Sequence, residues 1–220
     1  MSETNHQDVQ LFAVTASGPV PLPVSPAARS FDDLYEGLAL GVYSALRTFA
    51  HHQFLYLAAH IERTRQSMVL LGWDYQLDEA ALRRALHTVC SAYHRPEARV
   101  RFDVLAEPAW ALGTDSRLLI ALMPFTPPSP DMVANGVRVD LALDLERTRP
   151  LAKTADFAVT RRRYPGGQAG GVSPGFWQAF SWFFSCSPVW FTGVFVSLFC
   201  LNRPQPADAA QVQLALHIFR

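Results

Sequence analysis

Residues 57–71, with the sequence LAAHIERTRQSMVLL, show the clearest periodic pattern in the chain. The apolar stripe of this stretch consists of Leu57, Ile61, Thr64, Met68 and Leu71. These positions recur at steps of four and three, which is the spacing of a helix that buries one face. The polar residues His60, Arg63 and Ser67 have the same spacing on a neighbouring face. The pattern predicts an amphipathic helix over 57–72.

A second helix is predicted over 78–94. Asp78 precedes it and is a suitable N-cap, because a short carboxylate accepts hydrogen bonds from the first backbone N–H groups of a helix. The apolar stripe consists of Leu82, Ala85, Leu86 and Val89. The residues Arg-Pro-Glu at 95–97 end the helix.

Several further segments between residues 10 and 145 are predicted to be strands. The candidate strands are 10–15, 42–48, 54–57, 99–105, 116–125 and 137–145. In 99–105 charged and apolar residues alternate, so Arg101 is expected to face outward. Two helices among several antiparallel strands indicate an α+β fold. We expect an N-terminal domain with an antiparallel sheet and two helices, followed by the start of an incomplete second domain.

Three prolines within residues 126–130 mark a domain boundary. We expect an N-terminal α+β domain at 1–125, an interdomain loop at 126–136 and the start of a C-terminal domain at 137–163. The tail at 164–220 differs in composition, since no charged residue lies between Tyr164 and Asn202.

The composition excludes several classes of function. The chain has 220 residues with 19 basic and 19 acidic side chains, so it lacks the basic excess of a nucleic-acid-binding protein. Three cysteines without CxxC spacing argue against a disulfide framework and a zinc site, and no metal is expected. The first ten residues are polar and are not typical of a secretory signal, so a cytoplasmic location is expected.

Lys153 is the only lysine in the chain, against 18 arginines. An ε-amine can lose its proton and attack a carbonyl carbon, whereas a guanidinium stays protonated. Lys153 is therefore either a nucleophilic amine or a surface lysine that persists by chance. Composition alone leaves both interpretations open.

Three segments resemble class IV aminotransferases, which are fold-type IV pyridoxal-phosphate enzymes. GVYSALRTF (41–49) is similar to the G-V-F-E-x-x-R strand of that family, and HIERTRQSMVLLG (60–72) is similar to its H-x-x-R-L-x-x-S helix. RTRPLAKTADF (147–157) is similar to the segment with the cofactor lysine, K-x-x-N-Y/F. The resemblance covers about residues 35–163 and rests on the order of the segments and on the lone lysine.

The resemblance implies pyridoxal 5'-phosphate as cofactor and assigns roles to four residues. Lys153 corresponds to the lysine that holds the cofactor aldehyde, and Arg63 to the arginine that binds its phosphate. Arg101 lies on the strand that contacts the substrate carboxylate in related enzymes, although its pattern favours an outward-facing charge. Tyr43 either lines the substrate pocket or belongs to the core.

The chain also departs from the family pattern. Leu38, Ser44 and Asp156 stand where the family has tyrosine, glutamate and asparagine. No glutamate follows Glu146, so the family's E-G-x-x-S/T-N-x-F pattern, with the glutamate that pairs with the pyridine nitrogen, is missing. Without that acid the cofactor is a poorer electron sink. Family members are also longer.

The tail contains 26 uncharged residues at 176–201, which is long enough for a membrane span. A shifted reading frame after about Tyr164 is the interpretation that we favour. A C-terminal membrane anchor and a divergent buried core are the alternatives, and Pro188 in mid-span weakens the anchor.

The resemblance implies transfer of an amino group between an amino acid and a 2-oxo acid by a homodimer. An aminodeoxychorismate lyase-like enzyme of the same fold shares every motif. A non-catalytic remnant that keeps only the first domain, and a membrane-tethered protein, remain further alternatives. The missing acid favours little or no turnover.

Overall fold

The computed structural model describes residues 8–135, 137–139, 151–156 and 212–214. The chain divides into two compact units, the first formed by 1–125 with 147–159 and the second by 126–146 with 160–220.

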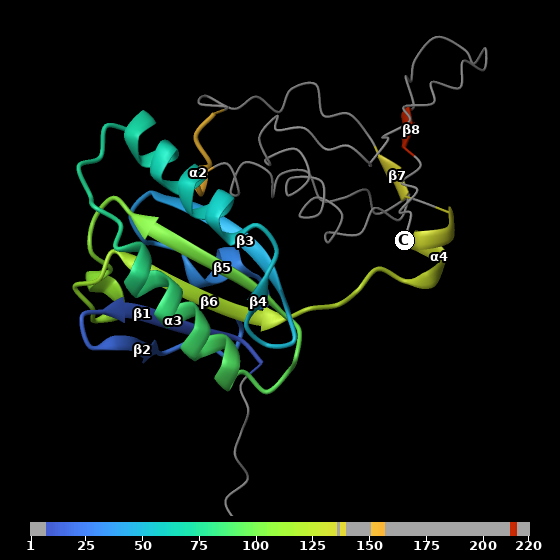
Figure 1. The fold of residues 1–220 in the computed structure, drawn as a ribbon, viewed down its shortest axis with the longest axis horizontal. Coiled ribbons are helices and arrows are strands. Elements are labelled where there is room, and N and C mark those ends of the chain that lie inside the picture. The colour runs from blue at the N-terminus through green and yellow to red at the C-terminus, as the bar shows by residue number, and fades with distance from the viewer. Residues whose placement is uncertain (1–7, 136, 140–150, 157–211, 215–220) are drawn as a thin grey trace, which may run out of the picture. The chain divides into compact units, whose positions relative to one another are not determined.

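The first unit contains a six-stranded sheet with the order β2-β1-β6-β5-β3-β4 (Figure 1). The strands are β1 (Gln10–Thr15), β2 (Gly18–Leu22), β3 (Gly41–Phe49), β4 (Gln53–Phe54), β5 (Ala98–Leu105) and β6 (Leu118–Pro124). All neighbouring strands are antiparallel. The predicted α+β fold with an antiparallel sheet is confirmed.

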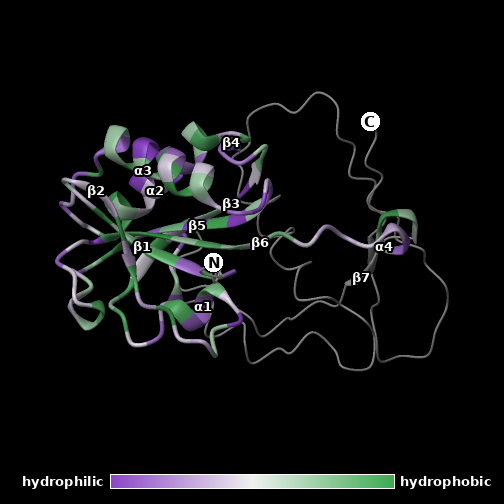
Figure 2. Cartoon of the chain, turned by 90° about the horizontal axis from the view of Figure 1, so that it is seen from below, coloured by the Kyte–Doolittle hydropathy of each residue, from purple (hydrophilic) through white to green (hydrophobic). Residues whose placement is uncertain are grey.

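Helices cover both faces of this sheet. The helices α2 (Leu57–Leu70) and α3 (Glu79–Ala92) lie on one face, as the sequence periodicity predicts. The short helix α1 (Phe31–Leu34) lies on the opposite face (Figure 2). A 3-10 turn, η1 (Trp110–Leu112), precedes β6.

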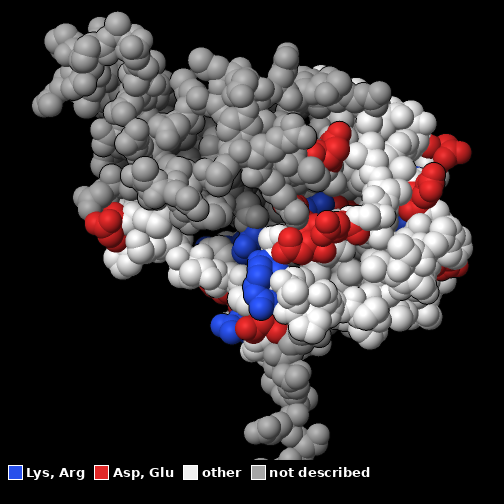
Figure 3. Space-filling view, turned by 180° about the vertical axis from the view of Figure 1, so that it is seen from behind, with Lys and Arg blue, Asp and Glu red and all other residues white. Residues whose placement is uncertain are grey.

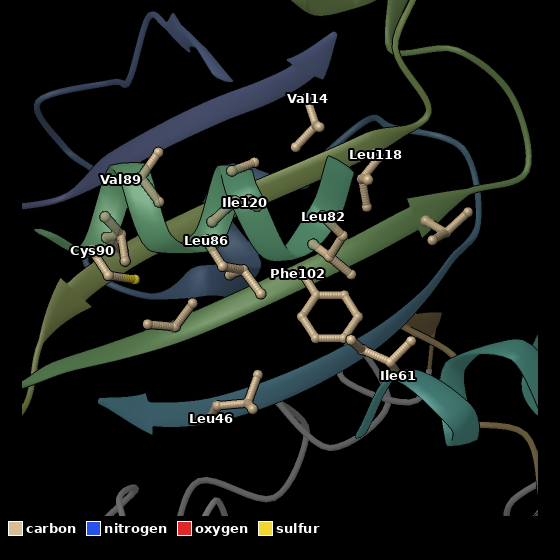
Figure 4. Close-up of a cluster of buried hydrophobic side chains, with 14 of the residues drawn as sticks. Val14, Leu46, Ile61, Leu82, Leu86, Val89, Cys90, Phe102, Leu118 and Ile120 are labelled. Atoms are coloured by element: carbon tan, nitrogen blue, oxygen red, sulfur yellow. The ribbon is translucent and has the colours of Figure 1, made fainter. Parts of the chain in front are cut away.

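The main core lies between α3 and the central strands (Figure 4). Leu82 and Leu86 of α3 pack with Phe102 of β5 and Ile120 of β6, and all four side chains are fully buried. Each such side chain contributes roughly 1.5–3 kcal/mol relative to an exposed position. Asp78 caps α3, because its Oδ1 atom accepts a hydrogen bond of 2.9 Å from the Ala81 N–H group.

Part of the polar stripe of α2 is buried together with part of its apolar stripe. His60, Thr64 and Ser67 are buried beside Ile61 and Met68. Buried polar groups need hydrogen-bond partners, so this face of α2 presents a polar network to the sheet.

Two sequence-based expectations about elements were wrong. The predicted strand at 54–57 is limited to Gln53–Phe54, because Tyr56 has a positive φ of 55° and turns the chain into α2. The proline-rich loop contains helix α4 (Pro130–Asn135). Proline is tolerated at the first position of a helix, and Ser129 Oγ accepts a hydrogen bond of 3.2 Å from the Met132 N–H group.

The second unit contains α4 and a two-stranded antiparallel pair, β7 (Val137–Val139) with β8 (Val212–Leu214). The domain limits expected at 126–136 and at 164 remain predictions. Within the ranges that the structure describes, no helix combines the length and the apolar character that a membrane span needs. The apolar stretch 176–201 lies outside those ranges.

On the side of the molecule shown in Figure 3, basic side chains lie next to acidic ones. This mixture agrees with the equal numbers of basic and acidic residues in the sequence. Arg47 and Glu97 form an ion pair of 2.8 Å.

Candidate active site

Lys153 is attached to the start of β3 by backbone hydrogen bonds. Its carbonyl oxygen accepts from the Tyr43 N–H group at 3.1 Å, and the Ala155 N–H group donates to the Gly41 carbonyl oxygen at 2.8 Å. Thr154 forms an antiparallel bridge with Val42. The short segment 151–156 therefore continues the sheet at β3. Only 6% of the Lys153 surface is exposed, so this lysine is not a solvated surface residue.

A second element, α2, also holds the Lys153 backbone. The N–H group of Lys153 donates to Ser67 Oγ at 3.2 Å. The Ser67 hydroxyl in turn donates to the Arg63 carbonyl oxygen at 2.8 Å. Lys153 thus has fixed backbone contacts on β3 and α2.

Arg63 lies on the polar stripe of α2 and is half-buried. Its Nη2 atom donates to Ser44 Oγ at 3.1 Å and is 3.1 Å from His60 Nδ1. Ser44 is itself fixed, because its hydroxyl contacts the His60 carbonyl oxygen and Thr64 Oγ1, each at 3.2 Å. The guanidinium is therefore oriented by neighbours on β3 and α2.

The charges of both predicted cofactor residues, Arg63 and Lys153, affect the pKa of His60. Burial, together with the positive charges of Arg63 and Lys153, lowers the pKa of the His60 imidazole to about 3. Both cations therefore lie near one imidazole, so the structure brings Lys153 and Arg63 into one neighbourhood.

Tyr43 lies next to Lys153. The Lys153 Nζ atom is 5.0 Å from the centroid of the Tyr43 ring, and the Arg101 guanidinium carbon is 4.2 Å from the same centroid. Both distances are within the range of cation–π attraction. Tyr43 is buried and its ring contacts the candidate nucleophile, and a place in the substrate pocket remains a prediction.

The expectation that Arg101 faces outward was wrong, because only 3% of its surface is exposed. Its Nε and Nη2 atoms donate to the two carboxylate oxygens of Asp103 at 2.8 and 2.7 Å, and Nη1 donates to Asp32 at 3.0 Å. The guanidinium also packs on the rings of Tyr35 and Tyr43, at 4.3 and 4.2 Å. Burial is the largest single influence and lowers the pKa of Arg101, but the Asp103 carboxylate, Tyr35 and Tyr43 together outweigh it, and the pKa is raised.

The sequence did not predict that His60 and Ser44 contact the Arg63 guanidinium, or that Ser67 contacts the Lys153 backbone. The spacing of His60, Arg63 and Ser67 indicated a shared helix face, but it did not show what that face contacts. A pocket of about 490 Å³ lies elsewhere, between Thr15, Tyr75 and Arg117, and its lining includes none of the predicted site residues.

The profile of the family described as amino-transferase class IV matches residues 41–161, which is more than half of the chain. This range includes β3, α2 and the lysine segment. No curated protein sequence matches the chain.

Several solved structures are similar to this chain. A fold IV transaminase from Curtobacterium pusillum has 20% identity and a TM-score of 0.50, with 70% of this chain and 58% of that chain covered. A hypothetical aminotransferase from Mycobacterium tuberculosis, in its PLP-bound form, has 18% identity and a TM-score of 0.48, with 74% and 60% covered. A branched-chain aminotransferase from Thermoproteus uzoniensis has 19% identity and a TM-score of 0.48, with 70% and 54% covered.

The C. pusillum structure supports the fold described above, and at these identities the similarity concerns the fold alone. The chain spans less than two thirds of the length of each of the three proteins.

Proposed function

The chain belongs to the amino-transferase class IV family, and we propose that it transfers an amino group between an amino acid and a 2-oxo acid with pyridoxal 5'-phosphate as cofactor. The observation that carries the proposal is the position of Lys153. The only lysine of the chain is buried against Tyr43 and attached to the helix that carries Arg63.

The described residues fit the two groups by which this cofactor is held, its aldehyde and its phosphate. An aldehyde requires an amine that can lose its proton, and Lys153 supplies the only lysine amine in the chain. A phosphate requires fixed N–H donors with a permanent positive charge, which Arg63 provides. The Lys153 N–H group bonds Ser67 on the same helix, α2, that carries Arg63, which supports the placement of both cations in one site. When bound, the cofactor supplies an electron sink for the charge that develops on the substrate Cα atom.

Each residue has a separate task in this proposal. The Lys153 Nζ atom binds the cofactor aldehyde and later moves the proton at the substrate Cα atom. Arg63 donates hydrogen bonds to the phosphate. Tyr43 orients the Lys153 amine through its ring.

Arg101 has a different task from the one that the resemblance implies. All three of its guanidinium nitrogens donate to carboxylates, and its flat face packs on Tyr43. We propose that it supports Tyr43 and does not bind the substrate carboxylate. A homodimeric state and a cytoplasmic location remain predictions.

Amino transfer can be tested with the purified full-length chain, pyridoxal 5'-phosphate and a panel of amino acids. Mass spectrometry of the product mixture should detect a 2-oxo acid from at least one donor. Lys153→Arg should reduce product to background, because arginine keeps the charge but cannot bind the aldehyde. Arg84→Gln, at an exposed site on α3, is a control that should retain activity. Equal product from Lys153→Arg, or no product from any donor, would contradict the proposed activity.

A further inference from the structure

His60 is a buried titratable side chain with no assigned role, and it lies directly against Arg63. Only 1% of its surface is exposed, and its Nδ1 atom is 3.1 Å from Arg63 Nη2. A guanidinium has N–H donors and no acceptor. The Nδ1 atom must therefore accept this hydrogen bond, which places the imidazole proton on Nε2.

Two hydrogen bonds from Nη2 fix one edge of the Arg63 guanidinium. Nη2 carries two hydrogens, and it has two acceptors, His60 Nδ1 and Ser44 Oγ, each at 3.1 Å. Both acceptors are buried. Since neither can move freely, the plane of the guanidinium is determined by them.

The two acceptors are also uncharged. A carboxylate in either place would form an ion pair with Arg63 and cancel part of the charge that attracts an anion. Burial and the neighbouring cations keep His60 neutral, since they lower its pKa to about 3. The side chain can therefore orient Arg63 without neutralising it.

We infer that His60 is a positioning residue for Arg63, whose guanidinium its Nδ1 atom holds in place to receive the phosphate of the cofactor. This inference rests on the proposed function, because it assigns Arg63 to a phosphate. It adds a residue that acts through Arg63 and that touches neither substrate nor cofactor.

The test compares the affinities of the full-length chain for pyridoxal 5'-phosphate and for pyridoxal, which lacks the phosphate. Visible absorbance of the covalent adduct gives both dissociation constants. Their ratio isolates the contribution of the phosphate, because internal hemiacetal formation in pyridoxal is the same for every variant. The wild-type chain should prefer the phosphorylated form by about tenfold to hundredfold, as a hydrogen-bonded charge does.

Two substitutions of His60 distinguish positioning from general packing. His60→Leu removes the acceptor and should lower the phosphate preference by about tenfold, with little change in the affinity for pyridoxal. His60→Asn keeps an acceptor near the Nδ1 position and should retain most of the preference. His87→Leu, at an exposed histidine of α3, is the matched control and should leave the ratio unchanged.

A second measurement needs no cofactor. In ¹⁵N NMR spectra of the imidazole side chains, His60 should appear as the neutral form with its proton on Nε2, and Arg63→Gln should shift its Nδ1 signal. Full phosphate preference in His60→Leu, or a proton on His60 Nδ1, overturns this inference while the proposed function stands. A wild-type chain that forms no adduct, or that does not prefer the phosphorylated form, overturns both.

Discussion

Tyr43 is the residue whose ring contacts both the candidate nucleophile and a buried cation. Lys153 Nζ and the Arg101 guanidinium lie 5.0 and 4.2 Å from its centroid. Tyr43→Phe keeps the ring and should bind pyridoxal 5'-phosphate as the wild type does. Tyr43→Leu should weaken binding by roughly fivefold, because a cation–π contact contributes about 1 kcal/mol. An absorbance titration measures both, and equal affinities of the two variants would argue against a role for the ring.

His60 should make the stability of the chain depend on pH. Its pKa falls from 6.5 to about 3 on folding, through burial and the charges of Arg63 and Lys153. Between these values the unfolded chain binds a proton that the folded chain excludes. The free energy of unfolding should therefore decrease as the pH falls from 6.5 towards 3, by up to about 1.4 kcal/mol per pH unit, and His60 should have no effect at higher pH.

The comparison of wild type with His60→Asn isolates this effect. Urea unfolding at a series of pH values should give a flatter profile for the variant below pH 6.5, because asparagine does not titrate. Parallel profiles for the two proteins would show that His60 is not held neutral in the folded state.

Two of the candidate site residues could be identified from the sequence. Lys153 stands out as the one lysine, and Arg63 follows from its place in the resemblance. The roles of His60 and Ser67 were not predictable, because helical spacing shows which residues share a face and not what that face meets. Ser67 contacts the backbone of a residue 86 positions away, and no local pattern reports such a contact.

Among the helices and strands, α1 and β5 are joined by a buried ion pair network. Arg101 of β5 bonds Asp103 on the same strand and Asp32 of α1. Asp103→Asn should lower the free energy of unfolding by roughly 3–5 kcal/mol, because it leaves the Arg101 charge buried without its main partner. Denaturant unfolding at neutral pH measures this loss.

The double variant Arg101→Met with Asp103→Leu should recover most of that stability, since apolar side chains of similar size often replace a buried ion pair without loss. Arg83→Met, in an exposed pair on α3, is the control and should change stability little. A double variant as unstable as Asp103→Asn would show that the pair itself stabilises the fold.

The positions of most elements were predictable, and the exceptions have physical causes. Both long helices and the antiparallel strands follow from apolar periodicity. The burial of Arg101 could not be predicted from periodicity. Alternation of residues separates the two faces of a strand, but it does not show whether the second face is covered. The cover is α1, which has four residues and is too short for a periodic pattern. Its capping box, formed by Ser30 and Asp33, is the one local signal.

At the scale of the whole molecule, the compact unit that contains the sheet also contains both Arg63 and Lys153, whereas the sequence analysis assigned Lys153 to the start of a C-terminal domain. That unit joins 1–125 with 147–159, so the lysine segment packs with the first domain. The expected start of a C-terminal domain at 137–163 and the apolar tail at 164–220 remain predictions. Local patterns do not predict how a distant segment pairs with β3, since that pairing depends on contacts far apart in the sequence.

Covalent binding of pyridoxal 5'-phosphate by Lys153 is the step on which the proposed function depends. The most direct measurement is reduction of the full-length chain with borohydride in the presence of the cofactor, followed by peptide mass spectrometry. The modification should lie on Lys153 and be absent from Lys153→Arg, in which the N-terminal amine is the remaining aliphatic amine. A modification confined to the N-terminus, or one that persists unchanged in Lys153→Arg, would contradict the assignment.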